Sequence, residues 1–164
     1  MGIDIIDEKL EREIEQEVES ICKWAAARAG VIVVAPLLGT MALIANEVYM
    51  IMRIGKAHGE TLSESMVVGF LSSLGAAFVG QTLATLIPFA PVQIPIAVSV
   101  TYALGKVAHA WLKAGKPNDL DFLKKVFEQE QSKAKKNITL LLDNPKKDEP
   151  LGDERKDYKS EIKL

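Results

Sequence analysis

The sequence is poor in the residues that carry out chemistry. Its 164 residues include one cysteine, Cys22, and two histidines, His58 and His109, which lie far apart in the chain. A single cysteine cannot form an internal disulfide bond, so nothing indicates an oxidising compartment. No phosphate-binding GxxxxGK[ST] sequence, GxSxG or HExxH occurs. We therefore predict no enzyme activity, no catalytic residue, no cofactor and no metal site.

These three residues have structural interpretations. His58, which precedes Gly59, is expected at the end of a helix, and His109 is expected at an interface. Cys22 lies at the edge of an apolar helix face and is expected to be a buried thiol. A functional role for any of them is the minor alternative.

A strong excess of one charge is also missing. The formal net charge is −2, and no stretch combines dense Lys and Arg with aromatic residues, so nucleic-acid binding is not expected. The N-terminus, MGIDIIDEKLERE, lacks a basic segment followed by an apolar one, so it is not expected to be a signal peptide. The charged residues are concentrated in residues 3–23 and 113–164, which leaves the middle of the chain apolar.

Charge is absent over the forty residues from Met66 to Gly105. A helix needs about 20 apolar residues to cross the ~30 Å hydrocarbon core of a bilayer, so the 22 residues from Met66 to Ile87 are long enough. Three prolines interrupt the segment and are expected to form a turn: Pro88, Pro91 and Pro95. The segment therefore predicts an apolar helical hairpin.

Small residues recur along both legs of this hairpin, mostly at every fourth position. They are Gly69, Ser72, Ala76, Gly80 and Ala84 on the first leg and Ala97, Thr101 and Gly105 on the second. In lipid, such ridges allow two helices to approach closely, as in a glycine zipper. We predict that the two ridges pack on each other. The alternative is that small residues are simply common in a crowded helical core.

Basic residues flank both ends of the hairpin, whereas its proline-rich tip is uncharged. They are Arg53 and Lys56 before it and Lys106, Lys113 and Lys116 after it. By the positive-inside rule we expect a membrane protein with both hairpin ends and the polar tail in the cytoplasm. The second leg counts against two complete spans, because only 17 uncharged residues run from Phe89 to Gly105.

An amphipathic helix is predicted from Ile3 to about Ala27. Its apolar positions are three or four residues apart: Ile3, Ile6, Leu10, Ile14, Val18, Ile21 and Ala25. Glutamates at positions 11, 13, 15, 17 and 19 lie mostly on the other faces. The helix is expected to pack on the rest of the domain, or alternatively to form a coiled coil or dock a partner. Its acidity argues against binding flat on an anionic bilayer.

Glu47 is the only acidic residue in the apolar surroundings between residues 29 and 52. A carboxylate in such surroundings is costly unless it is solvated or paired. Arg53 is six residues further on, too far for a pair on the same helix face, so any partner must come from another segment. Glu47 is therefore a candidate functional polar residue.

The chain beyond the apolar segment is polar. Asn118 or Asp119 is expected to cap a helix that runs to about Leu141. Residues 143–164 are charged, contain two prolines and lack a hydrophobic pattern, which predicts a disordered tail. The predicted fold class is all-α: a helical bundle in one domain, residues 1–142, with a central apolar hairpin, a long amphipathic N-terminal helix and a polar C-terminal helix.

Residues 24–115 resemble the YcjF-like family, a domain of unknown function often found C-terminal to Era-like GTPase domains. The similarity rests on the order of four segments: WAAARAGVIVVAPLLG, VYMIMRIGKAHGETLSE, FLSSLGAAFVG and LIPFAPVQIPIAVSVTYALGKVAHAWLKAG. The resemblance implies a membrane-associated module without established enzymatic activity, and a GTPase acting in trans as a partner. Thr40 and Met41 stand where the family often has an acidic residue, and the chain contains no GTPase domain.

Three functions agree with these observations. The leading prediction is a non-enzymatic membrane module, whose hairpin inserts into or docks on a lipid bilayer and whose polar helices bind cytoplasmic partners. One alternative is a soluble all-helical adaptor that buries the hairpin in its own bundle. The other is a homo-oligomeric pore or channel-like assembly with polar residues facing inward: Gln81, Thr82, Gln93, Ser99 and Thr101.

Overall fold

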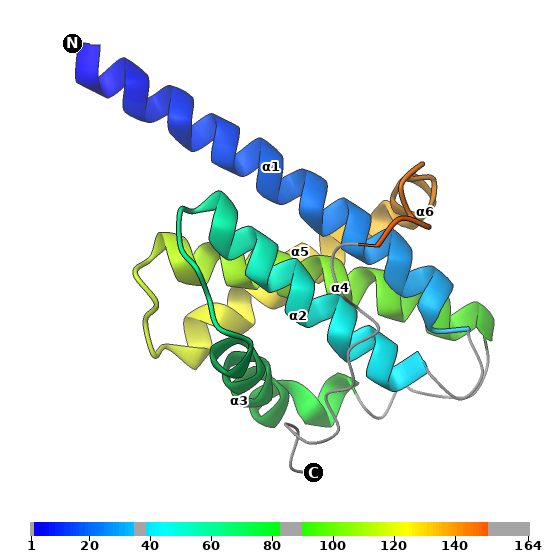
Figure 1. The fold of residues 1–164 in the computed structure, drawn as a ribbon. Coiled ribbons are helices and arrows are strands. Elements are labelled where there is room, and N and C mark those ends of the chain that lie inside the picture. The colour runs from blue at the N-terminus through cyan, green and yellow to red at the C-terminus, as the bar shows by residue number, and fades with distance from the viewer. Residues whose placement is uncertain (1, 35–38, 83–89, 151–164) are drawn as a thin grey trace.

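The chain folds into a bundle of α-helices (Figure 1). The computed structural model describes residues 2–34, 39–82 and 90–150, and no strand is assigned within these ranges. The helices found there are α1 (Gly2–Ile32), α2 (Gly39–Ala57), α3 (Glu64–Thr82), α4 (Ala90–Lys113), α5 (Leu120–Lys136) and α6 (Ile138–Leu142). The all-α class predicted from the sequence is therefore confirmed for the described part of the chain.

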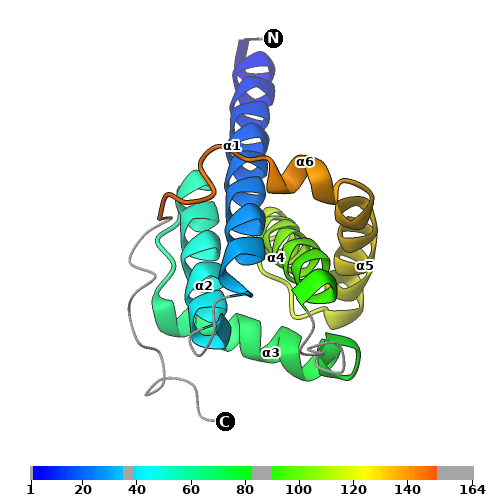
Figure 2. The same ribbon diagram turned by 90° about the vertical axis from the view of Figure 1, so that its right-hand side faces the viewer.

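Helix α4 is the centre of the bundle. The helices α1, α2, α5 and α6 all pack against it, and Figure 2 shows α2 and α5 on either side of it. Helix α3 contacts α2 and α5, and Phe70 on α3 stacks on Trp111 of α4 with ring centroids 4.4 Å apart. Figures 1 and 2 show that α3 lies crosswise to α4. The two legs of the predicted hairpin therefore cross instead of lying side by side.

The core is centred between α1, α2 and α4 and extends to buried residues of α3, α5 and α6. On α1 and α2 the fully buried apolar residues recur every three or four positions: Val18, Cys22 and Ala25 on α1, and Val48, Ile51 and Ile54 on α2. Helix α4 contributes Val98 and Val107, which are also fully buried. Burying each of the larger side chains is worth about 1.5–3 kcal/mol relative to leaving it in water. The periodicity that predicts an amphipathic helix from the sequence therefore matches the packed face of α1 from Val18 onward.

Gly105 allows α4 to pass close to α1 and α2. A Cβ atom at this buried position would lie 2.5 Å from Cys22 Sγ and 3.0 Å from Met50 Sδ, both closer than normal contact. Cys22 is itself buried, and its burial raises the pKa of the thiol. A small residue at position 105 thus allows close helix packing. The helices that approach it are α1 and α2, whereas the prediction was the first leg of the hairpin.

Helix α4 begins within the segment expected to form a turn. Pro91 and Pro95 are the second and sixth residues of α4, whereas Pro88 lies outside the described residues. The first four N–H groups of a helix have no intrahelical acceptor, so Pro91 removes no helical hydrogen bond. Only Pro95 does so. Pro91 and Pro95 therefore belong to the helix and not to a turn.

The described residues include no helix long and apolar enough to cross a membrane. This finding overturns the predicted membrane module, its transmembrane hairpin and the membrane localisation with cytoplasmic hairpin ends. One reason is that α3 is 19 residues long and begins with the charged Glu64. Another is that α4 carries Lys106 and Lys113 in its second half and is covered by other helices of the same chain.

Residues 143–150, the first part of the predicted tail, lie against α1. Trp24 Nε1 donates a hydrogen bond to the carbonyl oxygen of Glu149 at 3.0 Å. The guanidinium of Arg28 donates to the carbonyl oxygens of Lys147, at 3.4 Å, and Glu149, at 2.5 Å. These bonds hold the segment beside α1, whereas residues 151–164 lie outside the described part of the chain.

Candidate functional site

The N-terminal half of α1 projects from the bundle, and its apolar face is uncovered. Figures 1 and 2 show this half extending beyond the ends of the other helices. Along its apolar positions the exposed fraction rises outward, from 0% at Val18 to 54% at Leu10 and 67% at Ile6. Ile14, between them, is partly buried. The face that packs into the core at Val18 therefore continues into solvent.

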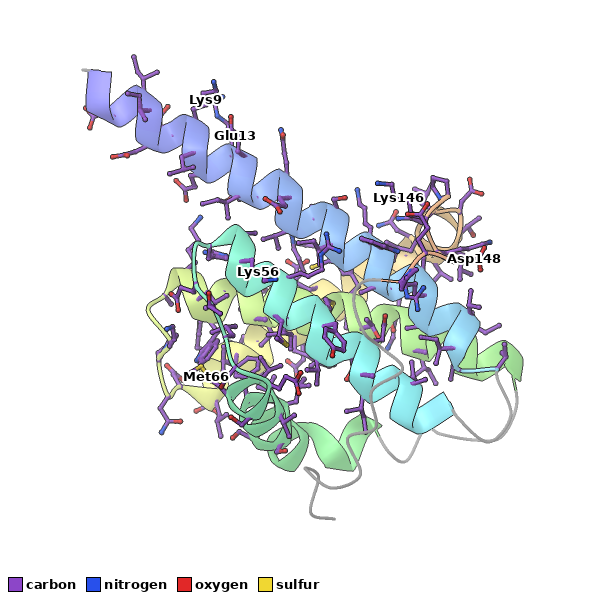
Figure 3. The ribbon with its side chains drawn as sticks, in the orientation of Figure 1. Lys9, Glu13, Lys56, Met66, Lys146 and Asp148 are labelled. Carbon is purple, nitrogen blue, oxygen red and sulfur yellow. The ribbon has the colours of Figure 1, made fainter. Side chains whose placement is uncertain are left out.

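The opposite side of the projecting helix is mostly polar. Figure 3 shows Lys9 and Glu13 on the side that faces away from the bundle, where their charged atoms are 3.9 Å apart. Ile5, which is 63% exposed, lies about 140° around the helix from Leu10, at about 100° per residue. The projecting half of α1 is therefore amphipathic. Leu10 and Ile14 line a cleft beside α4, whereas Ile6 lies about 120° around the helix from Val18, at the edge of the apolar face next to Glu13.

An acidic row accompanies the apolar face. It has one carboxylate at every fourth position: Asp7, Glu11, Glu15 and Glu19. Helix α4 supplies the cations for part of this row. Lys106 Nζ donates to Glu19 Oε2 at 2.8 Å, and Lys113 Nζ donates to Glu15 Oε1 at 3.1 Å. Lys113 also forms an ion pair with Glu11.

These contacts favour the ionised form of Glu15 and Glu19. Burial acts to raise the pKa of Glu19, but hydrogen bonds from Lys106 and Tyr102 outweigh it, so the pKa lies below its ordinary value. The Tyr102 hydroxyl donates to Glu19 Oε1 at 2.8 Å. The hydrogen bond from Lys113 likewise lowers the pKa of Glu15. Both glutamates are therefore carboxylates at neutral pH.

A cleft of about 360 Å³ lies beside α1 where α4 ends. Its lining includes Asp7, Leu10 and Ile14 from α1, Leu112 from α4, and His58 and Glu60 from the segment after α2. Helix α4 stops here because Gly115 and Lys116 adopt φ angles of 80° and 61°, outside the right-handed helical region. The cleft thus combines part of the uncovered apolar face with the outer end of the acidic row.

His58 and His109 meet in this cleft. His58 Nε2 and His109 Nδ1 are 2.8 Å apart, so one ring donates a hydrogen bond to the other. Burial lowers the pKa of His109 to about 4, and repulsion between the two rings when both are protonated acts in the same direction. Burial also lowers the pKa of His58. Both imidazoles are therefore neutral at pH 7. The sequence alone does not indicate this contact, because the two residues are 51 positions apart.

Glu47 lies partly buried on α2. Its partner is neutral: the Thr101 hydroxyl of α4 donates to Glu47 Oε1 at 3.5 Å. Burial raises the pKa of Glu47 to about 7, although the hydrogen bond from Thr101 opposes this shift. The neighbouring Asn46 is fully buried and donates from Nδ2 to the carbonyl oxygen of Ala25 at 3.0 Å. Glu47 thus belongs to a polar contact between helices.

The other predicted packing residues have different environments. On α3, Gly69 and Ser72 are exposed, and a Cβ at Gly69 would meet nothing within 4 Å. On α4, Ala97 is partly buried and Thr101 is buried. The surroundings of Ala76 and Gly80 and the position of Ala84 lie outside what the structure describes. The predicted glycine zipper is therefore not supported.

In the described ranges, no three or more His, Cys, Asp and Glu residues are arranged to hold a metal ion. Comparison of the chain with family models, with curated proteins and with solved structures finds no match. The resemblance of residues 24–115 to the YcjF-like family stays a prediction. The candidate functional site is the uncovered face of α1 together with the cleft at the end of α4.

Proposed function

We propose that the protein is a non-enzymatic helical adaptor, and that the projecting half of α1 binds an α-helix of a partner protein. The observation that carries this proposal is the row of apolar side chains on α1 that is buried at Val18, partly buried at Ile14 and exposed at Leu10, where it lines the cleft beside α4. Stable helices bury such a face against another element. A partner helix would cover the outer half of α1 in the way that α2 and α4 cover the inner half.

A helix is the occupant that fits this surface. Leu10 and Ile6, two exposed apolar side chains of α1, are four residues apart. Side chains at this spacing form ridges that pack into the grooves of another helix. Amphipathic helices commonly bind through anchors with this spacing. Full burial of Leu10 and Ile6 is worth about 1.5–3 kcal/mol for each side chain. Part of this gain offsets the loss of translational and rotational freedom on association.

The other functions have less support in the described residues. His58 and His109 hydrogen-bond to each other, so one ring nitrogen of each imidazole is already engaged within the protein. A homo-oligomeric pore would require the zipper that the exposed Gly69 and Ser72 do not support. A GTPase acting in trans, the partner that the family resemblance implies, is one candidate source of the docked helix.

A designed peptide tests this proposal. The probe is an amphipathic helix of about three heptads with leucine at the a and d positions and uncharged residues elsewhere. We expect the wild-type protein to bind it and Leu10→Ser to weaken binding about tenfold, the effect of losing ~1.4 kcal/mol of apolar contact. Fluorescence anisotropy of the labelled peptide measures both affinities.

Ile5→Ser is the matched control, because it removes a similarly exposed apolar side chain from the opposite side of α1. This variant should bind the peptide as the wild type does. Circular dichroism should show equal helicity and equal thermal stability for all three proteins. Equal affinity of Leu10→Ser and wild type would contradict the proposal. A concentration-dependent dimer that Leu10→Ser abolishes would identify a second copy of this chain as the occupant.

A further inference from the structure

We infer that the partner helix is basic, with Lys or Arg residues about seven positions apart beside its apolar face. This inference rests on the proposed function and specifies the chemistry of the partner. It follows from the way in which α4, a helix of the same chain, already contacts α1.

Helix α4 contacts α1 with a repeating pattern of cations. Lys106 bonds to Glu19 at 2.8 Å, and Lys113, seven residues later, bonds to Glu15 at 3.1 Å. Residues seven positions apart lie on the same side of a packed helix. Between these lysines, apolar side chains of α4 enter the core, with Val107 at 0% and Leu112 at 6% exposure. The inner half of α1 is therefore covered by a helix that combines an apolar face with lysines at a spacing of seven.

The surface that α4 recognises extends beyond its end. The acidic row continues outward to Asp7, four residues before Glu11, and the apolar face continues to Leu10. Asp7 and Leu10 both line the cleft beyond Leu112. A second helix placed in line with α4 would bury apolar side chains on Leu10 and bring a cation to Asp7, as Lys113 does at Glu11.

Charge argues against a second copy of α1 as the occupant. Residues 2–17 carry seven acidic and two basic residues, a net charge of −5. Pairing two such segments would bring like charges together along the whole contact, which disfavours the complex. A basic helix instead gains attraction along the same length, and this attraction also accelerates encounter.

Charge exchange tests the inference. Two probes share leucines at a and d and differ only in carrying lysine or glutamate at the flanking e and g positions. We expect the wild-type protein to bind the lysine probe about tenfold more tightly, with a preference that shrinks as salt screens the charges. Asp7→Lys should reduce this preference about threefold to tenfold, because an attraction of modest size becomes a repulsion.

Glu128→Lys is the matched control, because it makes the same change in net charge at an exposed position of α5. It should keep the preference of the wild type. If both probes bind equally and Leu10→Ser weakens both, the docking function stands and the basic character of the partner is refuted. If Asp7→Lys and Glu128→Lys change the preference equally, the acidic row does not select the partner. If neither probe binds, the inference and the proposed function both fail.

Discussion

Replacement of Gly105 by alanine measures how closely α4 packs against α1 and α2. The added methyl group would lie 2.5 Å from Cys22 Sγ and 3.0 Å from Met50 Sδ. Cys22 and Met50 are both fully buried, so neither sulfur can move into solvent without disturbing the core. Gly69 on α3 is the matched position, because it also lies within a helix but has nothing within 4 Å of the added atom.

Two effects of opposite sign act at Gly105. Alanine is favoured over glycine within a helix by about 1 kcal/mol, and this gain applies equally to Gly69→Ala. Overpacking of a buried site destabilises by about 1–3 kcal/mol and applies only to Gly105→Ala. The unfolding free energy of Gly105→Ala should therefore lie about 1–3 kcal/mol below that of Gly69→Ala. At roughly 2–4 °C per kcal/mol for a chain of this size, the melting temperatures should differ by roughly 2–12 °C.

Urea denaturation followed by circular dichroism gives both free energies. Cys22→Ala, combined with each glycine variant, tests the cause, because it removes the sulfur atom nearest to the new methyl group. In that background the difference between the two alanine variants should shrink markedly, and such non-additivity is expected for residues in direct contact. Equal stability of Gly105→Ala and Gly69→Ala in the wild-type background would refute the close approach of α4 to α1.

Three further measurements test other contacts. Burial raises the pKa of Glu47 from 4.5 to about 7, so the folded state binds more protons than the unfolded state between these pH values. The unfolding free energy should therefore fall as pH rises from 4.5 to 7, by at most about 3 kcal/mol. Glu47→Gln should flatten this pH dependence in urea titrations. The pKa of His109 is lowered from 6.5 to about 4, so stability should fall as pH drops through this range, and His109→Gln should lose less than wild type. Trp24→Phe removes the donor to the Glu149 carbonyl and should accelerate tryptic cleavage at Lys146 or Lys147, whereas Trp111→Phe should not. Unchanged profiles or cleavage rates would contradict the contact concerned.

Features governed by local sequence could be predicted. The spacing of apolar residues identified the buried face of α1 from Val18 to Ala25, because one helix face repeats every three or four residues. Asp119 was one of two expected N-caps, and its carboxylate accepts the N–H of Phe122 at 3.0 Å. Cys22 was expected to be buried and is buried. Each of these features depends only on residues within one or two turns of the same helix.

Features governed by tertiary packing could not be predicted from the sequence. An uncharged segment is apolar whether lipid or protein covers it, and here α1, α2 and α5 cover α4. The meeting of His58 and His109 depends on how α2 and α4 are placed, which their spacing in the sequence does not encode. A signal for the α1–α4 contact was present, since the sequence has an acid at positions 11, 15 and 19 and lysines at 106 and 113. It becomes interpretable only once the two helices are known to be neighbours.

The projecting half of α1 links folding to binding. Once packing fixes the inner half, each residue added outward extends an existing helix and avoids the unfavourable step of nucleation. The outer half can therefore be helical although Leu10 and Ile6 gain little from burial in the chain itself. A partner would meet a preformed helix, so little ordering of α1 opposes association. Substitutions along the same face should consequently divide by position: those at Val18 weaken the fold, whereas those at Leu10 weaken the complex and leave the fold intact.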